Sequence, residues 1–142
     1  MATLMQVEVV SPEKILFSGE ATMVLTRTLD GDIAFQANHA PFLGALAENH
    51  TKIYLADGTI QDVAVHGGFV EVSHNKVSIL SDVAELAQDI DLERARRAKE
   101  RAEEAVRRED DDEAEAALRR AHARLNAAGG MDGSSGGIRP AH

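Results

Sequence analysis

The pattern of residues changes once along the chain, near Asp89, and this change constrains the fold more than any other feature. Before it, apolar and polar residues alternate in short runs such as Gln6–Val9 and Gln61–His66, as in strands with one buried face. After it, residues 91–108 contain neither Gly nor Pro and consist mainly of Ala, Arg and Glu, which favour helices. The sequence therefore predicts a β-rich body followed by a helical segment.

Two predicted turns organise the strands of the body. Ala56–Thr59 contains Asp-Gly, which suits a hairpin turn with positive φ, and Ser73–Lys76 separates the apolar runs Phe69–Val72 and Val77–Leu80. Short strands at this spacing are typical of a sandwich or a barrel. No strand–helix–strand alternation is visible before Asp89, so a parallel sheet is not expected.

The helical segment is predicted to fold back on itself. Glu109–Asp112 places four acids in a row, and these repel one another and lie unfavourably at the negative end of a helix. Asp112 can cap a second helix, with Glu115 at capping-box spacing. The second helix should continue to about Ala128 and end at the Gly-Gly pair that follows, which is a usual C-terminal signal. Two helices joined by so tight a link form a hairpin.

Each predicted helix carries one apolar face at helical spacing, and alanine dominates both faces. The faces comprise Leu92, Ala95, Ala98, Ala102, Ala105 and Val106 on the first helix, and Ala114, Ala117, Leu118, Ala121 and Leu125 on the second. A buried methyl-sized group contributes only about 0.8 kcal/mol, and isolated helices of this length are marginal in water. The composition therefore leaves two alternatives open, a permanently docked hairpin and a mobile arm.

The distribution of charge excludes one class of function. Residues 1–88 contain 4 Lys or Arg against 11 Asp or Glu, whereas residues 89–128 contain 10 against 12. A nucleic-acid-binding protein needs a basic surface to meet phosphates, so no nucleic-acid partner is expected. The N-terminus lacks the basic flank and apolar run of a signal peptide, and the longest apolar runs are far shorter than a membrane span. We therefore expect a soluble, cytoplasmic protein that meets a membrane only through a partner.

No arrangement of residues indicates a catalytic or a metal site. Cysteine is absent, the six histidines form no His-x-x-x-His pair, and no nucleophile elbow, phosphate loop or dinucleotide fingerprint occurs. Gly67 and Gly68 begin a strand and are interpreted as a bulge or a close backbone approach rather than a phosphate-binding loop, and the adjacent His66 is given a structural role. The segment from Asp30 to Asp32 begins like a calcium loop but lacks the later ligands, so it is interpreted as a turn.

Three stretches, taken in order, resemble the ε subunit of F-type ATP synthase. Gly31–Pro41 is similar to that family's Gly-x-x-x-hydrophobic-x-x-x-His-x-Pro loop. Gly67–Asp82 is similar to its last sandwich hairpin, and Ile90–Ala95 to the opening of its charged helical hairpin. Each motif is short, but their order and spacing together are specific, and the resemblance covers about residues 4–128.

The resemblance implies a fold and a place in a larger machine. The fold is a flattened β-sandwich of about ten strands at residues 1–88, an antiparallel α-helical hairpin at 89–128 and a disordered Gly/Ser-rich tail at 129–142. The place is the rotor, at the foot of the γ subunit and against the c-ring, where a non-catalytic subunit couples proton-driven rotation to ATP synthesis. In that family the hairpin, extended toward the α and β subunits of the catalytic head, restrains ATP hydrolysis. The implied location is the cytoplasmic face of the bacterial plasma membrane, without insertion.

Two residues of the first motif are expected to contact partner subunits. The loop around Asp32 matches the part of the family that meets the c-ring, and His39 lies in the same motif, near the γ side. The family commonly has Pro-Gly before this histidine, whereas Ala37 and Asn38 stand here. Asn tolerates positive φ much as Gly does, so the departure is compatible with the same turn.

Some bacterial members of the family bind ATP on the folded hairpin through an Ile/Leu-Asp-x-x-Arg-Ala motif. The matching residues here are Ile90, Asp91, Arg94 and Ala95, together with Arg120 and Arg124 as phosphate-facing arginines and Glu85 as a partner of the adenine amino group. The alternative interpretation is that Asp at a helix start and Arg within a helix are ordinary. No cofactor is required under either interpretation, whereas a regulatory ATP would hold the hairpin in its docked state.

Two other classes of function would use the same hairpin. A free-standing ATP sensor would report nucleotide without belonging to a motor, and a scaffold would bind an unrelated partner through its helices. Neither would assemble with the α, β, γ and c subunits of an ATP synthase, and this distinguishes both from the rotor subunit.

Overall fold

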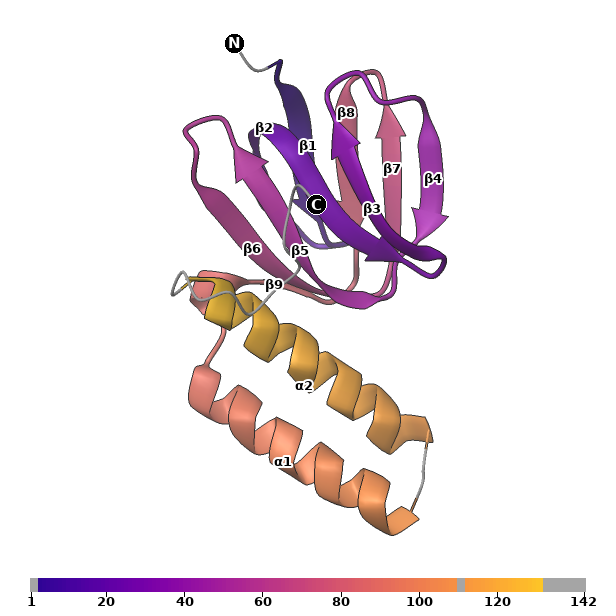
Figure 1. The fold of residues 1–142 in the computed structure, drawn as a ribbon, viewed down its shortest axis with the longest axis vertical. Helices are drawn as coiled ribbons and strands as arrows, with labels where there is room; N and C mark the ends of the chain where they lie inside the picture. The colour runs from indigo at the N-terminus through magenta and orange to yellow at the C-terminus, as the bar shows by residue number, and fades with distance from the viewer. Residues whose placement is uncertain (1–2, 110–111, 132–142) are drawn as a thin grey trace.

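The structure is a computed structural model that describes residues 3–109 and 112–131. It consists of a β-body and two helices that project from one end of that body (Figure 1). The strands are β1 (Met5–Val10), β2 (Ile15–Thr28), β3 (Gly31–Gln36), β4 (Phe42–Ala45), β5 (Glu48–Leu55), β6 (Ile60–His66), β7 (Phe69–Ser73), β8 (Lys76–Leu80) and β9 (Ala84–Leu86). A 3-10 turn, η1 (Ala87–Asp89), leads to α1 (Leu92–Glu109) and α2 (Asp112–Met131).

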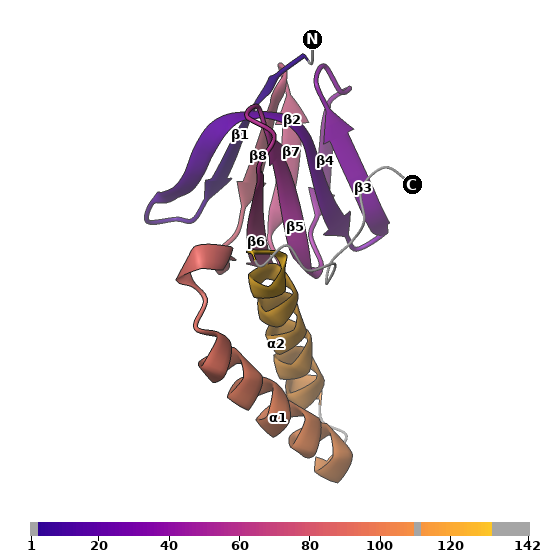
Figure 2. The same ribbon diagram turned by 60° about the vertical axis from the view of Figure 1, so that its left-hand side comes forward.

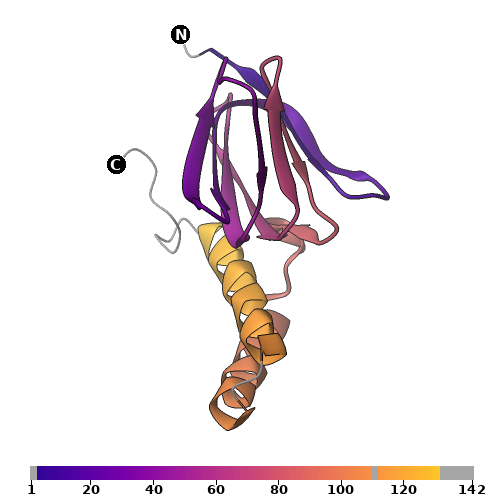
Figure 3. The ribbon, with the colours of Figure 1, turned by 90° about the vertical axis from the view of Figure 1, so that its right-hand side faces the viewer.

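One sheet of nine strands folds over into two layers. Its order is β4-β7-β8-β1-β2-β5-β6-β9, and β3 pairs with β2 off this path. The long strand β2 belongs to both layers, since its first half pairs with β1 and its second half with β3 and β5. Figure 3 shows the layers edge-on, with β3 and the second half of β2 on one side, and β7, β8 and the β1–β2 hairpin on the other. The predicted flattened sandwich is confirmed.

One pair of strands departs from the expected antiparallel arrangement. β1 and β8 run parallel, from Gln6 opposite Lys76 to Val10 opposite Leu80, while every other strand pair of the described sheet is antiparallel. The expectation of no parallel pairing holds for the sheet as a whole but is wrong here. The connection between β1 and β8 consists of strands rather than a helix, so the pattern that signals parallel strands never occurs.

The core lies between the two layers and is almost entirely aliphatic. Alternate residues of four strands point into it, namely Val7, Val9, Val63, Val65, Val70, Val72, Val77 and Ile79. Phe35 is the largest of the fully buried side chains, and its ring lies 5.0 Å from that of His39 and 5.4 Å from that of Phe42. A chain with few aromatic residues thus builds a valine-rich core with one aromatic cluster beside the β3–β4 connection.

The turns are those that the residue pattern predicts. Gly58, between β5 and β6, has a φ of 89°, and His74 and Asn75, between β7 and β8, have φ values of 51° and 59°. Asn38 has a φ of 64°, which is the left-handed conformation that Gly or Asn adopts most readily. Asp30 lies in the turn between β2 and β3, as predicted.

Of the two alternatives predicted for the Gly-Gly pair, a bulge and a close backbone approach, Gly68 shows the close approach. Its φ is 113°, and a Cβ at this position would lie 2.1 Å from the carbonyl oxygen of Leu80. Only glycine therefore fits where the chain enters β7 beside the end of β8.

The helices form the predicted antiparallel hairpin, and α2 packs against β5 and β6 while α1 packs on α2 (Figure 2). α1 ends at Glu109 and α2 begins at Asp112, so the break falls at the acidic run. The predicted end of the second helix is wrong, because α2 continues through the Gly-Gly pair to Met131. Ala127 and Ala128 are buried just before this pair, and their packing offsets the low helix propensity of glycine. The rest of the predicted tail, residues 132–142, lies outside the described residues.

Candidate functional site

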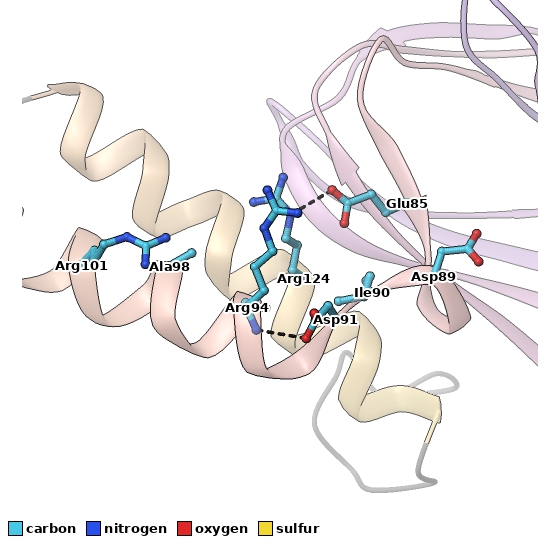
Figure 4. A pocket seen from close by; sticks show the side chains of 9 residues that line it. Glu85, Asp89, Ile90, Asp91, Arg94, Ala98, Arg101 and Arg124 are labelled. Atoms are coloured by element: carbon cyan, nitrogen blue, oxygen red, sulfur yellow. Dashed lines mark hydrogen bonds and ion pairs between the residues drawn. The ribbon is translucent and has the colours of Figure 1, made fainter.

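A pocket of about 450 Å³ lies where the chain passes from the β-body into the hairpin (Figure 4). We call it the hinge pocket, and it is lined by Glu85, Asp89, Ile90, Asp91, Arg94, Ala95, Ala98, Arg101 and Arg124. All the residues predicted to bind ATP line it except Arg120. The predicted site therefore brings together four segments, namely β9, η1, the start of α1 and the second half of α2.

Asp91 caps the first helix. Its Oδ1 accepts a hydrogen bond of 3.1 Å from the backbone N–H of Arg94, and its carbonyl oxygen accepts one of 2.9 Å from the N–H of Ala95. The motif residues thus have the ordinary structural role of starting α1. The same cap places Arg94 and Ala95 on the wall of the hinge pocket.

An ion pair joins the hairpin to the body at this pocket. Nε of Arg124 on α2 donates a hydrogen bond of 2.9 Å to Oε1 of Glu85 on β9. The two side chains are 27% and 30% exposed, so the pair is partly screened by water. A pair of this kind contributes at most about 1 kcal/mol. It is therefore a weak link that a competing ligand can replace.

Three guanidinium groups reach the hinge pocket, from Arg94 and Arg101 on α1 and from Arg124 on α2 (Figure 4). Within the described residues, neither the Arg94 nor the Arg101 side chain forms an ion pair with a carboxylate. Figure 4 draws Arg101 apart from Arg94 and Arg124, nearer Ala98. Planar guanidinium groups that line one pocket suit a phosphate or carboxylate ligand. Arg101 and Asp89 also line the pocket, and neither was among the predicted site residues. For Arg101 the available signal was its spacing of two helical turns from Arg94.

A second pocket, of about 390 Å³, continues between the two helices. It shares Ala98, Arg101 and Arg124 with the hinge pocket and is also lined by Arg120. The guanidinium of Arg120 donates a hydrogen bond of 2.9 Å to Glu113 on its own helix. Arg120 therefore lies beside the hinge pocket rather than in it.

His66 lies beneath the Glu85–Arg124 pair. Its side chain is 2% exposed, its Nε2 lies 3.8 Å from Oε1 of Glu85, and neither ring nitrogen has a hydrogen-bond partner in the described part of the chain. Burial and then the charge of Arg124 lower the pKa of His66 to about 4, although the charge of Glu85 opposes the change. The ring is therefore neutral at physiological pH.

The two residues expected to meet partner subunits have contacts within the body. Asp32 is exposed at the start of β3, and its Oδ1 accepts a hydrogen bond of 2.6 Å from Nε of Arg27. Nδ1 of His39 donates a hydrogen bond of 2.6 Å to the carbonyl oxygen of Ala40, and its ring meets that of Phe35 edge-on. His39 thus shapes its own loop, and the partner contacts of both residues stay predictions.

No described helix is both long enough and apolar enough to cross a bilayer. Among the residues described, no group of His, Asp and Glu side chains is arranged to hold a metal ion.

Comparison with known proteins gives matches over nearly the whole chain. The profile of the ATP synthase delta/epsilon chain β-sandwich domain matches residues 4–87, and that of the delta/epsilon chain long α-helix domain matches residues 88–129. The ATP synthase epsilon chain of Streptomyces griseus is 42% identical over 127 residues, which cover 89% of this chain and 97% of that one. The epsilon chain of Shouchella clausii is 42% identical over 130 residues, covering 90% and 96% of the two chains.

A solved structure shares the fold at low sequence identity. A chain of the Euglena gracilis mitochondrial ATP synthase, solved with its F1 head and c-ring, superimposes with a TM-score of 0.76 at 22% identity. The match covers 90% of this chain and 82% of that one. The sandwich, the hairpin and the two profile matches therefore agree, and the chain belongs to the ATP synthase delta/epsilon chain family, as a relative of the bacterial epsilon chains.

Proposed function

We propose that this chain is a non-catalytic central-stalk subunit of a proton-translocating F-type ATP synthase. It couples rotation of the c-ring to ATP synthesis in the catalytic head, and its hairpin restrains ATP hydrolysis when it leaves the body. The full-length likeness to bacterial epsilon chains supports this place in the complex. The subunit works at the cytoplasmic face of the bacterial plasma membrane, where its partners hold it.

The outer face of the β-body supports a contact with the γ subunit. Leu43, Phe69 and Leu80 are 70%, 52% and 43% exposed, and they lie on the adjacent strands β4, β7 and β8. Phe69 and Leu80 face each other across the β7–β8 ladder. Exposed apolar side chains that gather on one face are typical of an interface. We assign this face to γ and, from the family resemblance, the turn at Asp32 to the c-ring.

The hinge pocket carries the regulatory part of the proposal. We assign it a regulatory ATP, with the triphosphate on Arg94, Arg101 and Arg124 and the adenosine toward Ile90 and Asp91. A triphosphate would take Arg124 from Glu85 and leave that carboxylate for the adenine amino group. ATP would then replace the weak ion pair and bridge both helices.

ATP would act by mass action on the docked state. A ligand that binds only this state at a hundred times its Kd stabilises it by about 2.7 kcal/mol. This exceeds the contribution of at most about 1 kcal/mol from the partly exposed Glu85–Arg124 pair. A high ATP concentration would therefore hold the hairpin on the body, and ATP depletion would release it.

Calorimetry on the isolated chain tests the nucleotide site. We expect ATP to give saturable heat, and Arg101→Ala to weaken binding at least tenfold, since it removes a phosphate ligand but no part of the Glu85–Arg124 pair. The matched control is Arg96→Ala, on the same helix but outside the pocket and paired with Glu93. No saturable heat at millimolar ATP, or equal loss in both variants, would reject the site.

Purification from native membranes tests the place in the complex. A tagged chain should bring down the α, β, γ and c subunits, and their absence would reject the rotor assignment. A chain that lacks residues 89–142 should still assemble, because the sandwich carries the proposed contacts. The purified complex should then hydrolyse ATP faster than the wild type. Unchanged hydrolysis would indicate a permanently docked hairpin.

A further inference from the structure

The His66 side chain is buried and titratable, but it makes no hydrogen bond that would explain its place in the fold. Both ring nitrogens lack partners among the described residues, although the side chain is only 2% exposed. Neutral imidazole carries one donor and one acceptor, and leaving both unsatisfied costs free energy. An alternative conformation in which one ring nitrogen forms a hydrogen bond with the Glu85 carboxylate would recover part of that free energy.

Charged groups surround the ring on three elements. Glu85 approaches from β9 at 3.8 Å, and Arg120 and Arg124 act on it from α2. Glu48 lies opposite His66 in the β5–β6 ladder. Asp82 and His66 both line a pocket of about 380 Å³ at the end of β6.

Protonation of His66 would change the partner of Glu85. An imidazolium at this position is repelled by the two arginines of α2 and attracted by Glu85. The Glu85 carboxylate would shorten its distance to His66 and weaken its bond to Arg124, since both cations compete for the same Oε1. Glu85 would then pair with His66 inside the β-body, and Arg124 of α2 would lose its ion pair with β9.

We propose that His66 is a positioning residue for Glu85, and that a proton on His66 draws this carboxylate away from Arg124 and so releases the hairpin from the body. The proposal rests on the proposed mobility of the hairpin. It adds a second input, acidity, to the control that ATP exerts at the same pocket.

The direction in which pH changes docking follows from the coupling between proton binding by His66 and docking of the hairpin. His66 has a pKa of about 4 in the docked state and would regain an ordinary value near 6.5 once the hairpin leaves. The released state then binds more protons between these values, so the contribution of His66 to docking is fully present above about pH 6.5 and is lost as the pH falls toward 4. From pH 7.5 to pH 5.5 the ratio of released to docked molecules should rise about tenfold.

Energy transfer between two dyes measures this ratio on the full chain. The chain has no cysteine, so Glu13→Cys on the β-body and Arg107→Cys near the tip of α1 give unique labels at exposed positions. We expect about tenfold more released molecules at pH 5.5 than at pH 7.5 in the wild type. His66→Gln, which cannot titrate, should show no such rise.

Two matched variants test whether the response belongs to His66. His74→Gln, in the exposed β7–β8 turn, should leave the rise intact. His50→Gln should also leave it intact, although His50 is buried against Asp62 and shares a pocket with α2. A rise that persists in His66→Gln, or that disappears in His50→Gln instead, would overturn the proposal.

Arg124→Ala distinguishes the proposed role of His66 from the proposed mobility of the hairpin, on which that role rests. This variant lacks the ion pair and should release the hairpin even at pH 7.5, with the NMR titration midpoint of His66 moved upward from the wild-type value. Release in Arg124→Ala together with a wild type that does not respond to pH would overturn the role of His66 alone. No release in any variant would overturn the mobile hairpin, and the role of His66 with it.

Discussion

Glycines fix two turns of the β-body, and the reason why glycine is needed differs between Gly58 and Gly68. Gly58 has a positive φ, but a Cβ at this position would meet no neighbouring atom within 4 Å, so only its backbone conformation requires glycine. Gly68 has a positive φ and also meets the backbone of Leu80 and Ser81. The first constraint is conformational, whereas the second is conformational and steric.

Substitution at these two glycines should separate the two costs. Gly58→Ala should lower the free energy of unfolding by about 1 kcal/mol, the cost of a left-handed alanine. Gly68→Ala should lower it by more than about 3 kcal/mol, because the new Cβ would overlap the carbonyl of Leu80. Urea unfolding followed by circular dichroism measures both. Equal losses of unfolding free energy in the two variants would show that the backbone of β8 can move away from the new Cβ at position 68 without a measurable cost.

Among the elements, α2 is the one whose environment differs most from expectation. Its predicted apolar face includes Ala114 and Ala121, which are buried, but Ala123 and Ala127 outside that face are buried as well. The helix lies between α1 on one side and β5 and β6 on the other. Alanine on two sides lets it approach both neighbours closely, and it also explains why the hairpin is held by little apolar area.

A larger side chain inside this sandwiched helix should loosen the hairpin but not the body. Ala121 is 0% exposed, so Ala121→Leu should cost about 1–3 kcal/mol by overpacking. We expect faster amide hydrogen exchange throughout α2 and unchanged exchange in β7 and β8. Ala116→Leu, at a partly exposed position of the same helix, should have little effect. Equal protection in both variants would contradict this packing.

At the scale of the whole molecule, the core belongs to the β-body alone. Within the described residues, every member of the buried hydrophobic cluster lies between Met5 and Ile79, and none comes from either helix. The hairpin is thus attached to a body that holds its own core. A permanently docked hairpin and a mobile hairpin are both compatible with this arrangement.

Removal of the hairpin should therefore leave a folded body. A chain that ends at Gln88 should unfold cooperatively in urea and lose no more than about 2 kcal/mol of stability, as for a peripheral change. Ile79→Ala in the full chain should cost about 2–5 kcal/mol, since it opens a cavity in the core. Circular dichroism follows both transitions. An unfolded truncated chain would show that α2 is part of the structural unit.

The order and type of the elements and the positions of the main turns could be predicted from the residue pattern alone. These depend on local periods of two and 3.6 residues and on turn residues such as Gly58 and Asn38, which act within a few positions of themselves. The family motifs also located most of the hinge pocket, because residues 90–95 are contiguous and start a helix.

Contacts between residues far apart in the chain could not be predicted from the residue pattern and depend on the folded arrangement. The parallel pairing of β1 with β8, the continuation of α2 past its glycines, and the entry of Arg101 into the hinge pocket all depend on packing between segments far apart in the chain. His66 is the clearest case. Its position at the end of a strand suggested an ordinary structural histidine, and its approach to Glu85 on β9 and the influence of Arg124 on α2 come from segments later in the chain. Periodicity carries no information on such contacts, because long-range burial and charge arise only when the chain has folded.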